Sequence, residues 1–251
     1  MEEGPESAAE VYDTNRFSDL YHASRRPLPQ HLGLAARFLI ALFGSHSVFY
    51  AFLGGWAVYL RGGGRMTEDV DVSVATSMES LTAILLQEER ICVPRTYGTR
   101  CIQIFVHTGG NWDGQQSPRL NELAVSVDII INGNLGIPPD LPSATETITP
   151  SQPDINLGSN PVVPVINVFH QFATKLSVHH ARRQPEDYAD LEFLAETYPT
   201  EIFAVRNFLD KEHCEAFWLD YAARNAMDDV AVEGAARVRR LRVLLGLSMS
   251  P

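Results

Sequence analysis

Two aspartates lie two residues apart in a valine-rich segment, and their spacing is the first chemical signal in the sequence. Asp69 and Asp71 belong to "EDVDVSVA" (68–75), which alternates polar and apolar residues as a strand does. Both carboxylates therefore share one face of the strand, where they repel each other unless a cation lies between them. Because oxygen ligands suit Mg²⁺ or Mn²⁺, the pair predicts a site for one of these metals.

A third carboxylate occurs in a second apolar strand. Asp128 lies within "AVSVDIII" (124–131), where a lone charge is unfavourable without a cation or a hydrogen-bond donor. If this strand lies beside 68–75 with its polar side on the same face, Asp69, Asp71 and Asp128 converge. Metal ions held by three such carboxylates can activate an attacking oxygen and neutralise a leaving phosphate. We therefore expect all three to be catalytic metal ligands.

Glycines precede the aspartate pair. Gly54 and Gly55 follow the apolar run "SVFYAFL" (47–53), and a strand, a Gly-Gly turn and a helix start present backbone N–H groups that can receive phosphate. The sequence thus predicts that phosphate and metal meet at one edge of a sheet.

These residues must be positioned by a sheet and its helices. Residues 1–26 read as a mobile leader, and the alternation and helical spacing in 27–135 predict an α/β (α+β) domain with a mixed sheet and flanking helices. Residues 136–164 are rich in Pro, Ser and Asn and read as a linker. Residues 165–251 predict a helical domain. The expected strands are 47–53, 68–75, 99–108 and 122–133, and the expected C-terminal helices are 165–181, 185–197, 200–209, 211–225 and 228–246.

The overall composition limits the classes of partner. The 251 residues are 45% hydrophobic and carry a net charge of -11, so we expect a globular protein that does not bind duplex nucleic acid, which requires a basic surface. Arg37, residues 44–47 and the Gly54-Gly55 pair divide the apolar stretch 32–60 into pieces shorter than the roughly 20 residues of a membrane span. The acidic start of the chain does not resemble a secretory signal.

Cysteine usage points to a reducing compartment. Three widely spaced cysteines indicate neither a disulfide framework nor a zinc site. We therefore expect a cytoplasmic protein without a membrane segment. The sequence leaves its oligomeric state open.

Taken together, "GGWAVYLRGGGRMTEDVDV" (54–72) and "VSVDIII" (125–131) resemble the signature of the DNA polymerase beta-like nucleotidyltransferase superfamily. The run Arg65, Thr67, Asp69 and Asp71 is similar to its minimal, abortive-infection-toxin branch. The resemblance extends into "FATKLSVHHARRQPEDYADLEFL" (172–194), with the family-like positions Lys175, Arg182, Asp187 and Asp190. It covers about residues 48–195. It departs at Trp56, where many relatives carry a serine, and at Glu186, where a lysine is common.

The resemblance implies transfer of a nucleoside monophosphate from an NTP to an acceptor hydroxyl of a small molecule, a protein or an RNA end, with a small molecule favoured. It implies that Asp69 and Asp71 bind metal, that Asp128 also helps to deprotonate the acceptor, and that Gly54 and Gly55 hold the triphosphate. The further expected nucleotide-binding residues are Arg65, Thr67 and Lys175.

Several alternatives remain open at this point. Arg65 and Thr67 also fit a role in holding the turn before the strand, and Lys175 can extend from an apolar stripe. Asp187 and Asp190 fit a helix start and interhelix pairing better than metal ligation. The fold could also serve as a non-catalytic nucleotide-binding module, or catalyse a different reaction on a specialised metabolite.

Overall fold

The computed structural model describes residues 7–114, 120–152, 154, 155, 157, 161–225 and 231–248. The chain divides into two compact units, Met1–Ile166 and Asn167–Pro251. Within the described residues, no helix is both long enough and apolar enough to cross a membrane.

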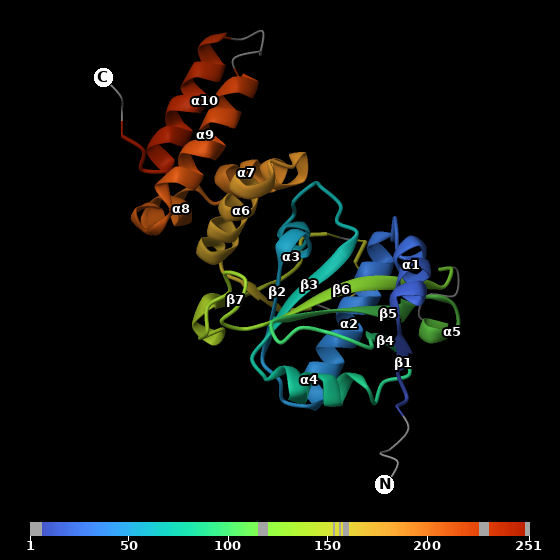
Figure 1. The fold of residues 1–251 in the computed structure, drawn as a ribbon. Helices are drawn as coiled ribbons and strands as arrows, with labels where there is room; N and C mark the ends of the chain where they lie inside the picture. Colours follow the sequence, from blue (N-terminus) through green and yellow to red (C-terminus); the bar gives the residue numbers. More distant parts are fainter. Residues whose placement is uncertain are drawn as a thin grey trace. The chain divides into compact units, whose positions relative to one another are not determined.

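The first unit is built on one mixed sheet (Figure 1). The order of its described strands is β1-β4-β5-β6-β3-β2-β8-β7. The pairs β1/β4, β3/β6 and β2/β8 are parallel, and the other neighbouring pairs are antiparallel. The strands are β1 (Glu10–Tyr12), β2 (Tyr50–Leu53), β3 (Asp69–Val74), β4 (Ile91–Pro94), β5 (Cys101–Thr108), β6 (Leu123–Ile131), β7 (Thr145–Ile148) and β8 (Val163–Ile166).

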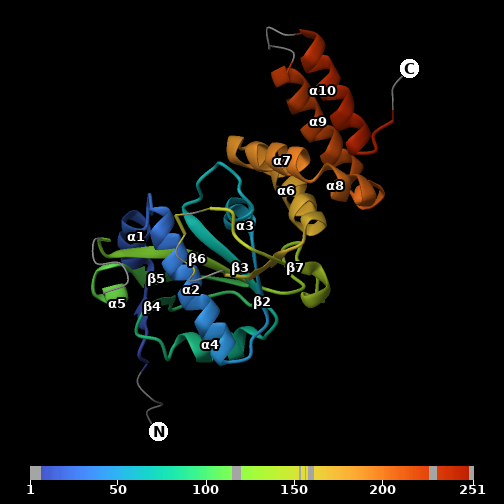
Figure 2. The same ribbon diagram turned by 180° about the vertical axis from the view of Figure 1, so that it is seen from behind.

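One face of the sheet builds the main core of this unit. Valines of β3 and β6, such as Val72 and Val127, are fully buried there. They pack with apolar residues of α2 (Pro29–Ser45) and α4 (Met78–Leu85). Helix α2 passes behind the sheet in Figure 1 and in front of it in Figure 2. Because strand side chains alternate, the aspartates of β3 lie on the opposite face, away from this core.

Local sequence explains where the helices begin. Helix α2 starts with Pro29 at its first position, where the missing N–H costs nothing. The Ser77 side chain caps α4 by accepting from the Ser80 N–H at 3.1 Å. This helix ends at Leu85, and β4 follows at Ile91. The other helices in the described part of this unit are α1 (Thr14–Ala23), α3 (Gly54–Leu60), α5 (Gly110–Asp113) and the 3-10 helix η2 (Pro142–Ala144).

The structure corrects two expectations about regular structure. Described residues 7–26 are not a mobile leader, since β1 pairs with β4 and α1 packs through Leu20 and Phe17 onto the sheet; residues 1–6 lie outside the described part. Residues 136–164 were read as a linker, but they hold β7 and the start of β8, which extend the sheet beyond β2. Their Pro- and Ser-rich sequence hides these strands because strands of four residues carry little periodicity.

The second unit is helical, as the sequence predicts. Its described elements are α6 (Val168–Arg182), α7 (Pro185–Thr197), α8 (Pro199–Val205), the 3-10 helix η3 (Arg206–Phe208), α9 (Lys211–Asn225) and α10 (Ala231–Leu244). The expected helix start at 228 lies outside the described residues. Its buried centre includes Phe172 of α6, Leu191 of α7 and Phe217 of α9.

Candidate active site

The Gly-Gly turn fits closely against the side chains that follow it in the sequence. β2 runs antiparallel to β3 with Leu53 opposite Asp71, so the next residue, Gly54, lies against the Asp71 carboxylate. Gly54 has a φ of 63°, and a Cβ at this position would overlap that carboxylate. Only glycine accepts both the backbone angle and the contact without strain.

The second glycine of the turn meets the predicted phosphate-binding residues. A Cβ on Gly55 would lie 2.7 Å from Arg65 Nη2 and 3.0 Å from Thr67 Oγ1. The Thr67 hydroxyl donates to Asp69 Oδ1 at 2.6 Å, and Arg65 Nη1 donates to the Met66 carbonyl at 3.1 Å. The turn, Arg65, Thr67 and the aspartate pair are therefore packed together, and Thr67 orients Asp69.

The three predicted carboxylates converge. β3 and β6 pair in parallel with Asp69 opposite Ser126 and Asp71 opposite Asp128. Asp69, Asp71 and Asp128 each offer an oxygen within 4.8 Å of the others, and all three are half-buried. Three anionic oxygens at this separation, partly open to solvent, fit a hard divalent cation such as Mg²⁺ or Mn²⁺. The donor set therefore fits the metal that the sequence predicts.

The electrostatics of Asp128 reflect this crowding. Burial, together with the nearby charge of Asp69, raises the pKa of Asp128 to about 6. A carboxylate with such a pKa holds a proton more readily than an exposed one. A cation placed among the three groups would offset their repulsion.

Sequence reasoning did not identify the neighbours of Asp128 on β5. Gln103 lies opposite Asp128 in the antiparallel pair of β5 and β6, and its amide nitrogen donates to Ser126 Oγ at 2.9 Å. The backbone carbonyl of Gln103 accepts from the Tyr12 hydroxyl at 2.7 Å. The polar residues of the alternating segment 99–108 could have indicated such neighbours, but the sequence does not show that this segment pairs with the strand that carries Asp128.

Trp56 belongs to the interior. Its side chain is fully buried in the main core, and its ring stacks on Tyr59 with 5.9 Å between ring centroids. The structure therefore places this side chain in the core, where many relatives are expected to carry a serine.

Lys175 lies in the second unit, on α6. Its ammonium is 2.7 Å from Asp190 Oδ2 and 3.5 Å from Asp187 Oδ1, both on α7. Arg182 also binds Asp187, with Nε 2.6 Å from Oδ2. All of these carboxylates and the lysine are buried. The four residues thus form an ion-pair network that joins two helices, as expected for interhelix pairing of Asp187 and Asp190, and no described contact tests the predicted phosphate role of Lys175.

Solved structures with a similar fold include an antigenic nucleotidyltransferase-like protein from Paracoccidioides brasiliensis. It is 19% identical, the match covers 66% of this chain and 76% of that chain, and the TM-score is 0.51. This similarity supports the nucleotidyltransferase-type fold that the sequence predicts. A search of curated proteins found no significant match.

Two further structures are less similar. The lincosamide antibiotic adenylyltransferase LnuA, bound to lincomycin, is 14% identical over 62% of this chain and 92% of its own, with a TM-score of 0.39. The antibiotic-resistance factor ANT(2'')-Ia is 13% identical over 82% of this chain and 96% of its own, with a TM-score of 0.38. Similarity at this level bears on neither fold nor substrate.

The family comparison is more extensive. Residues 37–241 match the sequence profile described as "Nucleotidyl transferase AbiEii toxin, Type IV TA system". This range includes the Gly-Gly turn, all three converging carboxylates and the ion-pair network of α6 and α7. The chain therefore belongs to the AbiEii nucleotidyl transferase toxin family and is a nucleotidyltransferase.

Proposed function

We propose that this chain is a metal-dependent nucleotidyltransferase that moves a nucleoside monophosphate from an NTP to an acceptor hydroxyl, with Mg²⁺ or Mn²⁺ as cofactor. The observation that carries the proposal is the convergence of Asp69, Asp71 and Asp128 within 4.8 Å on neighbouring strands. We favour a small-molecule acceptor. The net charge of -11 supports a partner other than duplex nucleic acid, whose phosphates require a basic surface.

The reaction assigns a task to each carboxylate. An acceptor oxygen forms a bond to the α-phosphorus of the NTP, the bond to pyrophosphate breaks, and the acceptor hydroxyl loses its proton. Asp69 and Asp71 would hold divalent metal, with Thr67 fixing the orientation of Asp69. Asp128 would share a metal and take up the acceptor proton. The metal, when bound, supplies charge neutralisation at the triphosphate and activation of the attacking oxygen.

The triphosphate would lie beside the Gly-Gly turn. Gly54 and Gly55 carry no side chain between the backbone and the aspartate pair, and the Arg65 guanidinium lies against Gly55. We assign Arg65 and Thr67 to the phosphate-binding region on this basis. We also propose that Lys175 contacts phosphate.

Titration calorimetry of ATP, CTP, GTP and UTP, with and without Mg²⁺, tests the nucleotide site. The expected result is metal-dependent binding of at least one NTP. That nucleotide, labelled at the α-phosphate, is then used to screen acceptor hydroxyls for transfer of the label.

Matched variants locate the activity. Asp69→Asn and Asp71→Asn should abolish metal-dependent binding and transfer, whereas Asp19→Asn, an exposed aspartate on α1, should leave both unchanged. Binding of no NTP contradicts the metal-and-phosphate role of Asp69 and Asp71 and favours a different reaction. Metal-dependent binding without transfer to any acceptor favours a nucleotide-binding module.

A further inference from the structure

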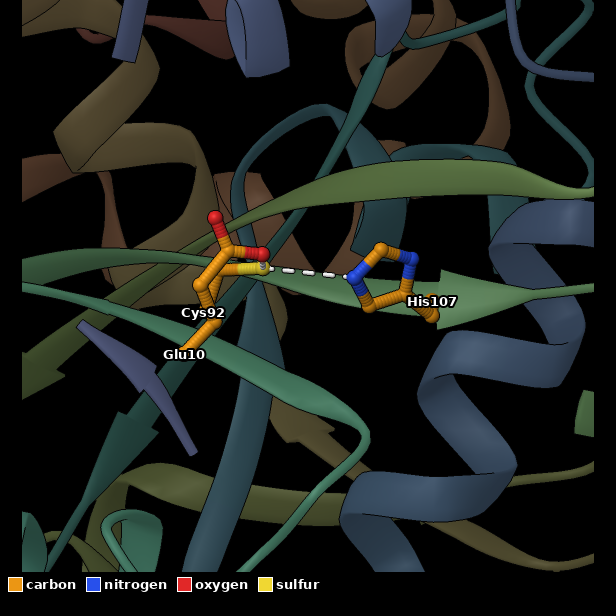
Figure 3. Close-up of side chains that lie close together, drawn as sticks. All are labelled: Glu10, Cys92 and His107. Carbon is orange, nitrogen blue, oxygen red and sulfur yellow. Dashed lines mark hydrogen bonds between the residues drawn. The ribbon is translucent and has the colours of Figure 1, made fainter. Parts of the chain in front are cut away.

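A second group of metal-ligand side chains lies on the three strands at one end of the sheet. Glu10 of β1 lies opposite Cys92 of β4, and Cys92 lies opposite Phe105 of β5. His107 follows two residues after Phe105, so it points to the same face of the sheet. Figure 3 shows the three side chains directed toward one another. They offer one sulfur, one nitrogen and one oxygen within 4.8 Å of one another.

The distances match those of a metal-binding site. Cys92 Sγ is 3.3 Å from His107 Nε2 and 3.4 Å from Glu10 Oε2. With metal–ligand bonds of about 2.3 Å to sulfur and about 2.0 Å to nitrogen or oxygen, a tetrahedral site requires its ligand atoms to be about 3.5 Å apart. The three atoms can therefore reach one ion with only small movements. Three protein ligands leave one position for a water molecule.

The chemistry of these ligands differs from that of the aspartate cluster. A thiol, an imidazole and a carboxylate suit Zn²⁺, whereas three carboxylates suit Mg²⁺. Metal binding to this group requires the neutral imidazole of His107 and the thiolate of Cys92.

Neighbouring side chains orient two of the ligands. Glu122 Oε1 lies 3.6 Å from His107 Nδ1, which is the position of the carboxylate that often supports a metal-binding histidine. Trp112 donates its indole N–H to the same oxygen at 3.1 Å, and its ring stacks on His107 with 5.2 Å between centroids. Arg16 binds both carboxylate oxygens of Glu10, since Nε donates to Oε1 at 2.6 Å and Nη2 donates to Oε2 at 3.3 Å. The same Oε2 lies 3.4 Å from Cys92 Sγ.

We propose that Glu10, Cys92 and His107 bind one Zn²⁺ ion, with water as the fourth ligand, and that this ion clamps β1 to β4 and β5. On binding, the Cys92 thiol releases its proton to solvent, and the thiolate and the Glu10 carboxylate together balance the charge of the ion. The ion would stabilise the pairing of β1, which is a short edge strand that leads directly into α1. This site is separate from the aspartate cluster and does not depend on the proposed transfer reaction.

The cysteine count alone pointed away from zinc, because Cys92 has no cysteine partner at a zinc-finger spacing. The cluster depends instead on strand pairing, which brings ligands from three distant segments together. Glu10, Cys92 and His107 lie too far apart in the sequence to form a recognisable spacing motif.

Cobalt spectroscopy tests the site directly. The purified full chain is freed of metal and titrated with Co²⁺, which takes tetrahedral zinc sites and gives a sulfur-to-cobalt charge-transfer band when a thiolate binds it. We expect this band to saturate at one Co²⁺ per chain and to disappear when Zn²⁺ is added. One equivalent of Zn²⁺ should also raise the melting temperature, because ligand binding to the folded state stabilises it.

Variants identify the ligands. Cys92→Ser should remove the band, and His107→Gln and the partly exposed Glu10→Gln should each weaken Zn²⁺ binding. Glu122→Gln should weaken it about tenfold, as expected for a carboxylate that supports a ligand. Two control variants, Cys101→Ser at the exposed cysteine and Asp69→Asn, should keep the band and the affinity. Melting curves in metal-free buffer show whether each variant folds.

Three results would overturn the proposal. These are the absence of a thiolate band in the unmodified chain, a band that persists in Cys92→Ser, and unchanged Zn²⁺ affinity in both Glu10→Gln and His107→Gln. None of them concerns NTP binding, so failure of the zinc site and failure of the transfer reaction are distinguishable.

Discussion

Asp71 of β3 and Asp128 of β6 lie opposite each other on adjacent parallel strands, in one register with Asp69 and Ser126. This pairing brings a carboxylate from a distant part of the chain to the aspartate pair. The half-buried position of these carboxylates, which would suit a metal site, is electrostatically unfavourable without a metal. Stability and activity should therefore respond in opposite directions to changes at these residues.

Asp128→Asn should stabilise the metal-free protein while it abolishes transfer. The substitution removes one of three crowded negative charges and keeps the size of the side chain, so we expect a gain of about 1 kcal/mol in the free energy of unfolding. Urea unfolding in EDTA measures this gain. Mg²⁺ should stabilise the unmodified chain and have a smaller effect on the variant, and a loss of stability in EDTA would argue against repulsion at this site.

Gly54→Ala should disturb both the turn and Asp71. The added Cβ meets a φ of 63° and the Asp71 carboxylate, so we expect a loss of about 1–3 kcal/mol in stability together with loss of metal-dependent NTP binding. Gly44→Ala is the matched control, because a Cβ there meets nothing within 4 Å and a helical alanine is favourable. Similar effects of the two substitutions would contradict the close-contact explanation.

Lys175→Met should destabilise the second unit. It removes an ammonium from the buried Asp190 and Asp187, and loss of one partner of a buried ion pair costs about 3–5 kcal/mol. Arg237→Met breaks the exposed pair with Glu233 and should cost less than about 1 kcal/mol. Guanidinium unfolding compares the two. An unchanged stability in Lys175→Met would show that the lysine does not hold α6 and α7 together.

The contribution of Asp187 should depend on pH. Burial alone would raise the pKa of Asp187, but hydrogen bonds from Arg182 and the charge of Lys175 outweigh it and lower the pKa. A lowered pKa in the folded state gives stability that is present above the unfolded value of about 4 and is lost as the pH falls through the folded value.

Arg182, the solvent-exposed ion-pair partner of Asp187, allows this pH dependence to be measured. Arg182→Gln should cost about 1–2 kcal/mol at pH 7, because it removes charged hydrogen bonds to Asp187. The difference from the unmodified chain, measured by urea unfolding between pH 7 and pH 3, should shrink as the pH falls. A difference that stays constant over this range would contradict the assignment.

Local sequence was sufficient to predict features that depend on a short repeat of residue types or on residues close in the chain. Alternation placed Asp69 and Asp71 together on one face of β3, because side chains two residues apart on a strand point the same way. The glycines of the turn and the helices after residue 165 were also readable from neighbouring residues. The expected strand 122–133 is observed as β6 at Leu123–Ile131.

Only the tertiary structure determined which distant segments of the chain lie next to each other. A two-residue shift between β3 and β6 would keep the valines in the core but would move Asp128 away from Asp71. The alternation within each strand does not choose between these two registers. Likewise, Lys175 meets Asp190 through the packing of α6 on α7. The sequence by itself thus determined the chemical groups and the strand faces that carry them. Strand order and register depend on contacts between distant segments, so only the tertiary structure could bring the three carboxylates into one cluster and Glu10, Cys92 and His107 into another.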